Sequence, residues 1–454
     1  MDRPFRERDA WALLACLFLG IATALYAGLA LRGLFGDGVH LLIRLMQGDS
    51  FWFAEPSRIT AVAILEAPTL AALKLGIGGL HTVAAILSVT LNILPLLVIA
   101  LCFGILPQHR RAFFLLPAFA TFGGIYAAWY VPIAEGLLAT AYFWLLFYLL
   151  LFAHDAPRWR ILIVALAIPT LALDEPMAFL APVLALAALR RRGALSAPLA
   201  LWFLAVALHA GWEILHPYNT ANRDRFAAHF LLLHWLRAPD GHVNGPAVLL
   251  LCAGAAIAGA ILRPAWRTPL LAAFTAAAFL VAAGAFLSDR LISPGAQFDS
   301  RYIPQLLSLP LALVALASLH RPAWVARWAT SSTQAIVLIL GLAGATWNIA
   351  AVLDWQRFTA TFRAALARHE GLVSWDTLIA ELNADDAARF KRMNWAWNFP
   401  ELSIVLSPGG DVHTILADPA GPGWRPFDPA VAAELPSGAL FSTSAYRAAR
   451  ARAR

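Results

Sequence analysis

Ionisable side chains stand at the ends of several long apolar stretches in this sequence, next to glycine, proline or tyrosine. Charged groups at the edge of a membrane-spanning segment are costly unless they pair or reach water, so they are functional candidates. Carboxylates there could serve as acids or bases, and arginines could bind anions. The residues that we single out are Asp37, Arg58, Glu135, Asp174, Glu175, Arg301 and Tyr302.

Two of these residues have no simple structural role. Asp37 stands between two glycines in "FGDGVH", where it has no obvious capping function. Arg301, in "DSRYIPQLL", stands at the start of an apolar helix, where a cation opposes the helix macrodipole unless an anion compensates it. Asp299 could be that anion in a purely structural pair. The sequence therefore leaves both anion binding and internal pairing open for Arg301.

The other carboxylates have structural explanations beside the functional one. Glu135 follows a proline in "VPIAEG" and could cap a helix. Asp174 and Glu175 precede Pro176 in "LDEP", a pattern typical of a helix N-terminus with proline in the first turn. The three cysteines lie in apolar stretches without metal-ligand spacing, so they are expected to be packing residues. We predict no metal site.

The composition is that of a membrane protein. Of the 454 residues, 60% are hydrophobic and 13% are charged, and the mean hydropathy is +0.68. A soluble domain carries about 25% charged residues. The formal net charge of +7 arises from basic residues in short loops, which orient membrane proteins, so nucleic acid is not expected as a partner.

Eleven apolar stretches predict transmembrane helices, given that neighbouring protein can shield the ends of the shorter ones. They lie near 10–32, 80–106, 112–131, 137–153, 160–173, 177–190, 197–215, 246–262, 268–288, 302–319 and 332–353. The pair at 160–190 is short, so the count could differ by one or two. Residues 59–76 are a further apolar stretch, interrupted by Glu66, Pro68 and Lys74, and we interpret it as a re-entrant or interfacial helix.

The short loops predict the orientation. "PQHRR", "HDAPRWR", "RRRG", "RPAWR" and "HRPAWVAR" alternate with "VPIAEG" and "LDEP", which contain no lysine or arginine. Because basic loops stay in the cytoplasm, the N-terminus is predicted to be cytoplasmic in the cell inner membrane. Segments 33–79, 216–245 and 289–301 then face outside, and an odd number of spans puts the C-terminal region on the periplasmic side.

The predicted fold is an all-α polytopic membrane protein of about 11 transmembrane helices with a small α/β extracytoplasmic C-terminal region. Residues 1–353 form the transmembrane domain, with interfacial helices in the first outer loop, 33–79. In the region 354–454, the first part has helical periodicity. After it, "LSIVLS" and "VHTILA" alternate around "PGGD", which predicts a β-hairpin.

This organisation resembles the GT-C superfamily of membrane glycosyltransferases, which take a sugar from a polyprenyl-phosphate carrier outside the cytoplasmic membrane. Three features carry the resemblance: an acid directly after the first span (Asp37), a first outer loop with interfacial helices (within 40–76), and an Arg-Tyr-x-x-Pro motif that enters a late span (Arg301, Tyr302 and Pro304). The resemblance covers residues 1–353 as organisation rather than as continuous identity.

The resemblance implies transfer of a hexose or pentose from a polyprenyl-phosphate-linked donor, with membrane lipids as further partners. Asp37 would be the catalytic base for the acceptor hydroxyl, and Arg301 with Tyr302 would hold the donor phosphate, which suits arginine's planar fork. The further substrate-binding candidates are Arg58, Glu135, Asp174 and Glu175. No cofactor is indicated, and a divalent metal is left open.

Three other functions compete with this one. A transporter or flippase would place charged residues at mid-bilayer on broken helices, and "LDEP" is such a break. A surface-polysaccharide polymerase or ligase also uses outer-face arginines, but it usually carries a larger late outer loop than 289–301. A non-enzymatic membrane protein would use the aromatic segment "MNWAWNFPEL" to bind a partner.

Overall fold

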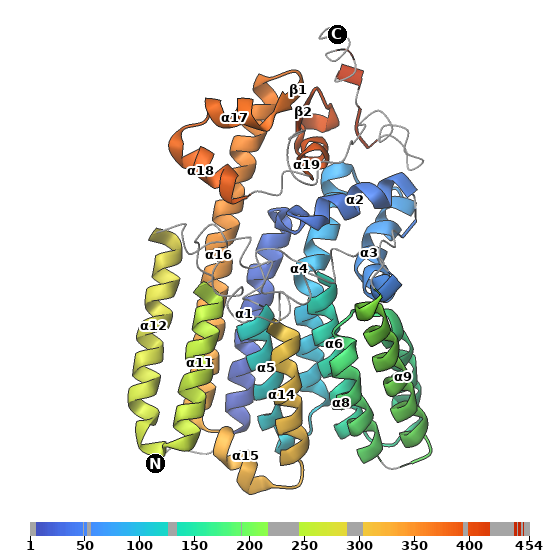
Figure 1. Cartoon of the computed structure of the whole chain (residues 1–454), viewed down its shortest axis with the longest axis vertical. Coiled ribbons are helices and arrows are strands. Elements are labelled where there is room, and N and C mark those ends of the chain that lie inside the picture. Colours follow the sequence, from blue (N-terminus) through green and yellow to red (C-terminus); the bar gives the residue numbers. More distant parts are fainter. Residues whose placement is uncertain are drawn as a thin grey trace. The chain divides into compact units, whose positions relative to one another are not determined.

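Figure 1 shows a computed structural model of the chain, which is helical over most of its described length. It describes residues 6–48, 50–51, 56–125, 134–191, 193–216, 245–287, 303–393, 398–417, 440–442, 444–445 and 448. The chain forms two compact units, which we describe separately. Unit 1 comprises Met1–Ala24, Phe53–Ala61 and Ile93–Ala350, and unit 2 comprises Leu25–Trp52, Val62–Asn92 and Ala351–Arg454.

Unit 1 is built from apolar helices that lie side by side. Helices α6 (Ala134–Phe152) and α9 (Ser196–Leu215) both pack against α8 (Met177–Arg190), and α11 (Gly245–Leu262) packs against α12 (Arg267–Leu287) (Figure 1). The remaining helical segments of unit 1 are η2 (Pro56–Arg58), η3 (Gln108–Phe114), α5 (Leu115–Ala120), η4 (Thr121–Ile125), α7 (Pro157–Ala167), η6 (Ile168–Ala172), η8 (Pro264–Trp266), α14 (Ile303–Ser318) and α15 (Pro322–Trp328).

Four long helices contribute residues to both units. They are α1 (Glu7–Leu29), α3 (Ile59–Lys74), α4 (Leu80–Ile105) and α16 (Ser331–Arg368). The last of these was expected to end with its apolar part at residue 353, but α16 continues without a break for 38 residues. Hydropathy marks where the apolar part stops, whereas the helix continues because no glycine or proline follows Gly344 within it.

Seven helices among the described residues are long and apolar enough to cross a membrane. They are Glu7–Leu29, Leu80–Ile105, Glu135–Phe152, Ser196–Leu215, Gly245–Leu262, Pro264–Ala285 and Ser331–Arg368. Two shorter apolar helices, α8 and α14, lie beside them in unit 1. The multi-pass, all-α membrane architecture is therefore confirmed, while the number of spans and the orientation stay predictions.

The predicted span at 112–131 is not one regular α-helix in its described part. Its described part consists of η3, the short helix α5 and the π-helical segment η4. A side chain on Gly124 would place its Cβ 2.6 Å from the Cα of Pro304, so the glycine permits η4 to lie directly against the start of α14. The irregular segment is therefore a close packing contact within unit 1.

Unit 2 combines most of residues 33–79 with the C-terminal region. Its own elements are η1 (Arg32–Leu34), α2 (Asp37–Gly48), β1 (Gly371–Ser374), α17 (Trp375–Glu381), α18 (Ala384–Arg392), α19 (Phe399–Leu406), η12 (Pro408–Gly410) and β2 (Thr414–Ala417). Helix α2 packs against α19, which in turn packs against β2. A core of aromatic rings from α16, α18 and α19, including Phe358, Phe390 and Phe399, joins these elements.

The predicted hairpin around "PGGD" is wrong. "LSIVL" belongs to helix α19, in which every residue is buried, so burial along the run is continuous rather than alternating. Strand β2 instead pairs in parallel with β1, with Gly371 opposite Thr414. Short apolar runs do not distinguish a buried helix from a strand, and a parallel partner far away in sequence leaves no local signal.

Candidate functional site

The "LDEP" turn of unit 1 joins η6 to α8 and presents two acids. The backbone carbonyls of Asp174 and Glu175 accept hydrogen bonds from the first amides of α8, at 3.1 and 3.0 Å. Pro176 is the N-cap residue of that helix, and no side chain caps it. Neither carboxylate therefore caps α8 with its side chain, although Oδ1 of Asp174 accepts a hydrogen bond from the backbone amide of Glu175 at 3.0 Å within the turn.

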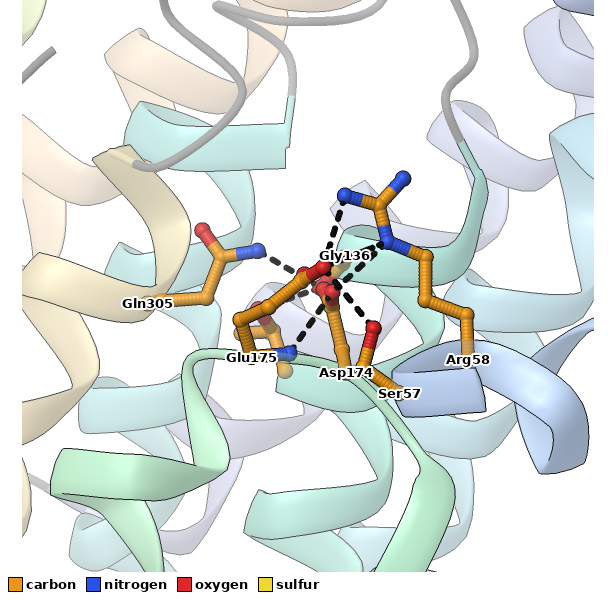
Figure 2. A network of polar contacts seen from close by, with 7 residues as sticks. Ser57, Arg58, Gly136, Asp174, Glu175 and Gln305 are labelled. Carbon is orange, nitrogen blue, oxygen red and sulfur yellow. Dashed lines mark hydrogen bonds and ion pairs between the residues drawn. The ribbon is translucent and has the colours of Figure 1, made fainter. Parts of the chain in front are cut away.

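Arg58 lies against both carboxylates (Figure 2). Its Nε donates to Oε1 and Oε2 of Glu175, both at 3.1 Å, and its Nη2 lies 3.0 Å from Oε1. The same Nε lies 3.5 Å from Oδ1 of Asp174. Ser57 Oγ completes the contacts by donating to Glu175 Oε1 at 2.9 Å. We call Ser57, Arg58, Asp174 and Glu175 the arginine–carboxylate cluster.

The cluster is largely removed from water. The side chains of Arg58, Asp174 and Glu175 are 17%, 5% and 12% exposed. Burial and the neighbouring Glu175 charge raise the pKa of the Asp174 carboxyl well above its ordinary value, and Glu135 adds to the rise. Burial also opposes ionisation of Glu175, but the charge and hydrogen bonds of Arg58 outweigh it and hold the pKa of Glu175 below its ordinary value.

These opposite shifts separate the roles of the two acids. Glu175 is the ionised partner of Arg58, and the two form a nearly neutral pair. Asp174 is the acid that binds a proton more readily, because burial disfavours its charge and Arg58 lies 3.5 Å from it but 3.0 Å from Glu175. The cluster could therefore hold a proton at Asp174 Oδ2 while Arg58 and Glu175 keep the site in place.

Two residues that are not ionisable fit closely against the cluster. Gln305, fully buried on the first turn of α14, donates from Nε2 to the carbonyl of Gly136 at 2.8 Å (Figure 2). A Cβ on Gly136 would lie 2.6 Å from Gln305 Nε2 and 3.0 Å from Asp174 Oδ2. The absence of a side chain at Gly136 therefore allows α6, α14 and the "LDEP" turn to meet.

Among the predicted residues, the structure brings together Arg58, Asp174 and Glu175, and it places Glu135 close enough to influence Asp174. Gln305 was not among the predicted residues, although it stands just after Pro304 in the "RYIPQLL" motif. An amide at the start of an apolar helix was the available signal. Arg301 and Tyr302 lie outside the described residues.

Asp37 belongs to unit 2, where it is the first residue of α2. Its side chain is partly exposed, and no hydrogen bond or ion pair involves it among the residues described. Three residues further along α2, His40 is buried and contacts Glu401 of α19 at 2.7 Å. The Asp37 carboxylate is therefore partly exposed at the start of α2, and α2 itself is anchored to α19 by the contact between His40 and Glu401.

Within the described ranges, no group of three or more histidines, cysteines or acids could hold a metal ion. The comparisons with protein-family models, curated proteins and solved structures found no match. The chain is thus a helical multi-pass membrane protein with a buried arginine–carboxylate cluster in unit 1 and a partly exposed aspartate in unit 2.

Proposed function

We propose that the protein is a membrane glycosyltransferase that moves a sugar from a polyprenyl-phosphate donor to an acceptor on the outer face of the cytoplasmic membrane. The observation that carries the proposal is that Asp37 is partly exposed and pairs with no cation among the described residues. A general base must be reachable by the acceptor and not already engaged by a cation. Asp37 meets these conditions among the described residues, whereas Glu175 is occupied by Arg58.

The resemblance to the GT-C superfamily supports the same assignment. In this proposal Asp37 removes the proton of the acceptor hydroxyl as that oxygen attacks the sugar carbon, and the polyprenyl phosphate leaves with the bonding electrons. Arg301 and Tyr302, from the Arg-Tyr-x-x-Pro motif, hold the leaving phosphate. The arginine–carboxylate cluster holds η2 against the turn before α8 within unit 1.

The experiment is a transfer assay with a labelled polyprenyl-phosphate hexose or pentose and membranes of the expressing cell as the acceptor source. Asp37→Asn keeps the shape of the side chain but removes its basicity, and transfer should fall about 10²–10⁴-fold. Asp376→Asn is the matched control, because Asp376 is also an exposed aspartate in the first turn of a unit 2 helix. Near-normal transfer by Asp37→Asn would remove this base and the proposal with it.

One observation favours proton-coupled transport as a second candidate. Asp174 is a buried acid of raised pKa in a break between helical segments, which is where transporters place coupling groups. Proteoliposomes with a pH-sensitive dye inside would test it. Asp174→Asn should abolish proton movement if the protein is a transporter, and Asp37→Asn should leave that movement intact.

A further inference from the structure

A basic pocket lies at one end of the unit 1 helices and shares no residue with the arginine–carboxylate cluster. Its volume is about 400 Å³, which is within the range of small-molecule sites. Its walls come from the ends of α6, α8 and α14 and from η3. The polar residues in its lining are His109, Arg110, Asp155, Arg190, Arg191 and His320.

Each arginine of the pocket first serves a structural role. Arg110 donates from Nη1 to the carbonyl of Leu319 at 2.9 Å, and Arg190 donates from Nη1 to the carbonyl of Leu316 at 2.8 Å. These bonds satisfy carbonyls at the C-terminal end of α14 that have no amide partner in the helix. Capping alone would explain one donor of each guanidinium.

The other donors point to a second role. A guanidinium has five N–H donors. Apart from these capping bonds, Arg110 and Arg190 have no acceptor among the described residues. Arg190 is exposed and Arg110 is partly exposed, so their free donors can reach a ligand in the pocket. Two forks in one cavity suit an anion with several oxygens, such as a phosphate.

The charge balance of the pocket favours the same ligand. Three arginines face one carboxylate, Asp155, which leaves two positive charges with both histidines neutral. Asp155 is bound by Arg160, at 2.8 and 2.9 Å, and by Nη2 of Arg191, at 3.2 Å, and these hydrogen bonds and charge contacts hold its pKa below the ordinary value. Arg191 also donates to the carbonyls of Leu149, Ala153 and His154, so its guanidinium is engaged. The acid is therefore paired with Arg191 and Arg160, and the charges of Arg110 and Arg190 remain for a ligand.

Neighbouring loops of unit 1 have the composition of a membrane surface. Guanidinium groups lie over tryptophan rings in three places: Arg158 on Trp159 at 5.8 Å, Arg263 on Trp266 at 5.4 Å and Arg321 on Trp324 at 5.2 Å. Tryptophan and arginine collect at the level of lipid headgroups. In Figure 1 the α8–α9 and α11–α12 loops and α15 lie at the same, lower end of unit 1.

From these observations we propose that Arg110 and Arg190 bind, in this pocket, the phosphate headgroup of an anionic membrane lipid. The acyl chains would lie along the exposed apolar side chains of the adjacent helices, among them Leu189 of α8. The basic loops are those predicted to face the cytoplasm, where anionic lipids bind cationic pockets between helices. This site is independent of the proposed transferase reaction.

The test uses the purified full-length protein, freed of lipid in detergent. Phosphatidylglycerol, cardiolipin and phosphatidylcholine are added separately, and binding is measured by native mass spectrometry and by the rise in melting temperature. The anionic lipids should bind and raise the melting temperature, and the neutral lipid should not. Arg110→Gln together with Arg190→Gln should weaken binding of the anionic lipids about tenfold or more. Arg263→Gln, which removes a charge outside the pocket, should bind them as the wild type does.

Three results would overturn the proposal. The first is equal binding of phosphatidylcholine, and the second is equal loss of binding in the pocket variant and in Arg263→Gln. The third is an equal rise in melting temperature with inorganic pyrophosphate at the same phosphate concentration as the lipid. That result would assign the pocket to a soluble anion.

A second variant serves if the double variant does not fold. His320→Glu places a negative charge at an exposed lining position that makes no hydrogen bond among the described residues. It should also reduce binding of the anionic lipids, and unchanged binding would contradict the site.

Discussion

Nδ1 of His40 lies 2.7 Å from Oε1 of Glu401, although 361 positions separate the two residues in the sequence. Both side chains are buried in unit 2, and the contact joins α2 to α19. The side-chain amide of Asn398 strengthens this connection by donating to the carbonyl of Gly36. The segment that follows α1 and the C-terminal region therefore fold as one body rather than as two separate parts.

Removing His40 should cost much more stability than removing a similar histidine at the surface. In His40→Ala the carboxylate of Glu401 would stay buried without its partner, at a cost of about 3 kcal/mol. His369 contacts Glu381 at 2.9 Å, but these side chains are 22% and 37% exposed, so His369→Ala should cost about 0–1 kcal/mol. Thermal unfolding in detergent measures both losses of stability. Equal losses would show that the buried pair contributes no more stability than the exposed pair.

The Arg58–Glu175 pair should be more costly to break than to remove. Arg58→Met leaves a buried carboxylate without its cation, which should lower stability by about 3 kcal/mol. The double variant Arg58→Met/Glu175→Gln should recover most of that loss, because neither residue is then charged. Melting temperatures of the three proteins test this. Arg160→Met, at the exposed pair with Asp155, is the control and should be near neutral.

The pH dependence of stability should carry the signature of Asp174. Since its pKa is raised in the folded protein, its contribution is fully present below the ordinary aspartate pKa of about 3.9 and is lost as pH rises through the folded value. Asp174→Asn should therefore melt at a higher temperature than the wild type at pH 8. The difference should shrink as pH falls and disappear below the ordinary aspartate pKa, where the carboxyl is protonated in both the folded and the unfolded state.

Glu175 should show the opposite sign. Its folded pKa is lowered, so its contribution is present above the ordinary glutamate pKa and is lost as pH falls through the folded value. Glu175→Gln should consequently melt below the wild type at pH 8, and the deficit should shrink in strong acid. The same sign for both variants would contradict the division of roles within the cluster.

Gly136 should not tolerate alanine. Its added Cβ would lie 2.6 Å from Gln305 Nε2, and Gln305 is fully buried and cannot move away freely. Gly136→Ala should lose about 1–3 kcal/mol of stability through overpacking. Gly254 on α11 has open space around the same position, so Gly254→Ala should be neutral or slightly stabilising. A harmless Gly136→Ala would mean that α6 and α14 can move apart.

The apolar stretches could be predicted because a membrane helix leaves a long hydropathy signal, and each of the eleven stretches has helical structure in its described part. Individual charged residues could also be picked out, since a buried charge needs a reason. Their pairing could not, because Arg58 and Glu175 are 117 positions apart and no periodicity connects them. Gln305 was missed because an amide inside an apolar stretch is less conspicuous than a charge.

The errors in the C-terminal region have a different cause. There the elements are short, and "LSIVL" is long enough for either a strand or a helix. Tertiary burial decided in favour of the helix, with Pro400 in its first turn. Helical periodicity after residue 353 was predicted, but its continuity with the span at 332–353 in the single helix α16 was missed, because hydropathy reports the surroundings of a helix and not its length.

At 1.5 Å per residue, the 38 residues of α16 measure roughly 57 Å from end to end, nearly twice the roughly 30 Å hydrocarbon thickness of a bilayer. Even a tilt of about 40°, the steepest usual for a membrane helix, would shorten its projection only to about 44 Å. A substantial part of α16 must therefore stand in water or headgroups. In the C-terminal portion of α16, the aromatic side chains of Trp355 and Phe362 are fully buried. Other residues of the protein therefore cover the apolar face of this segment.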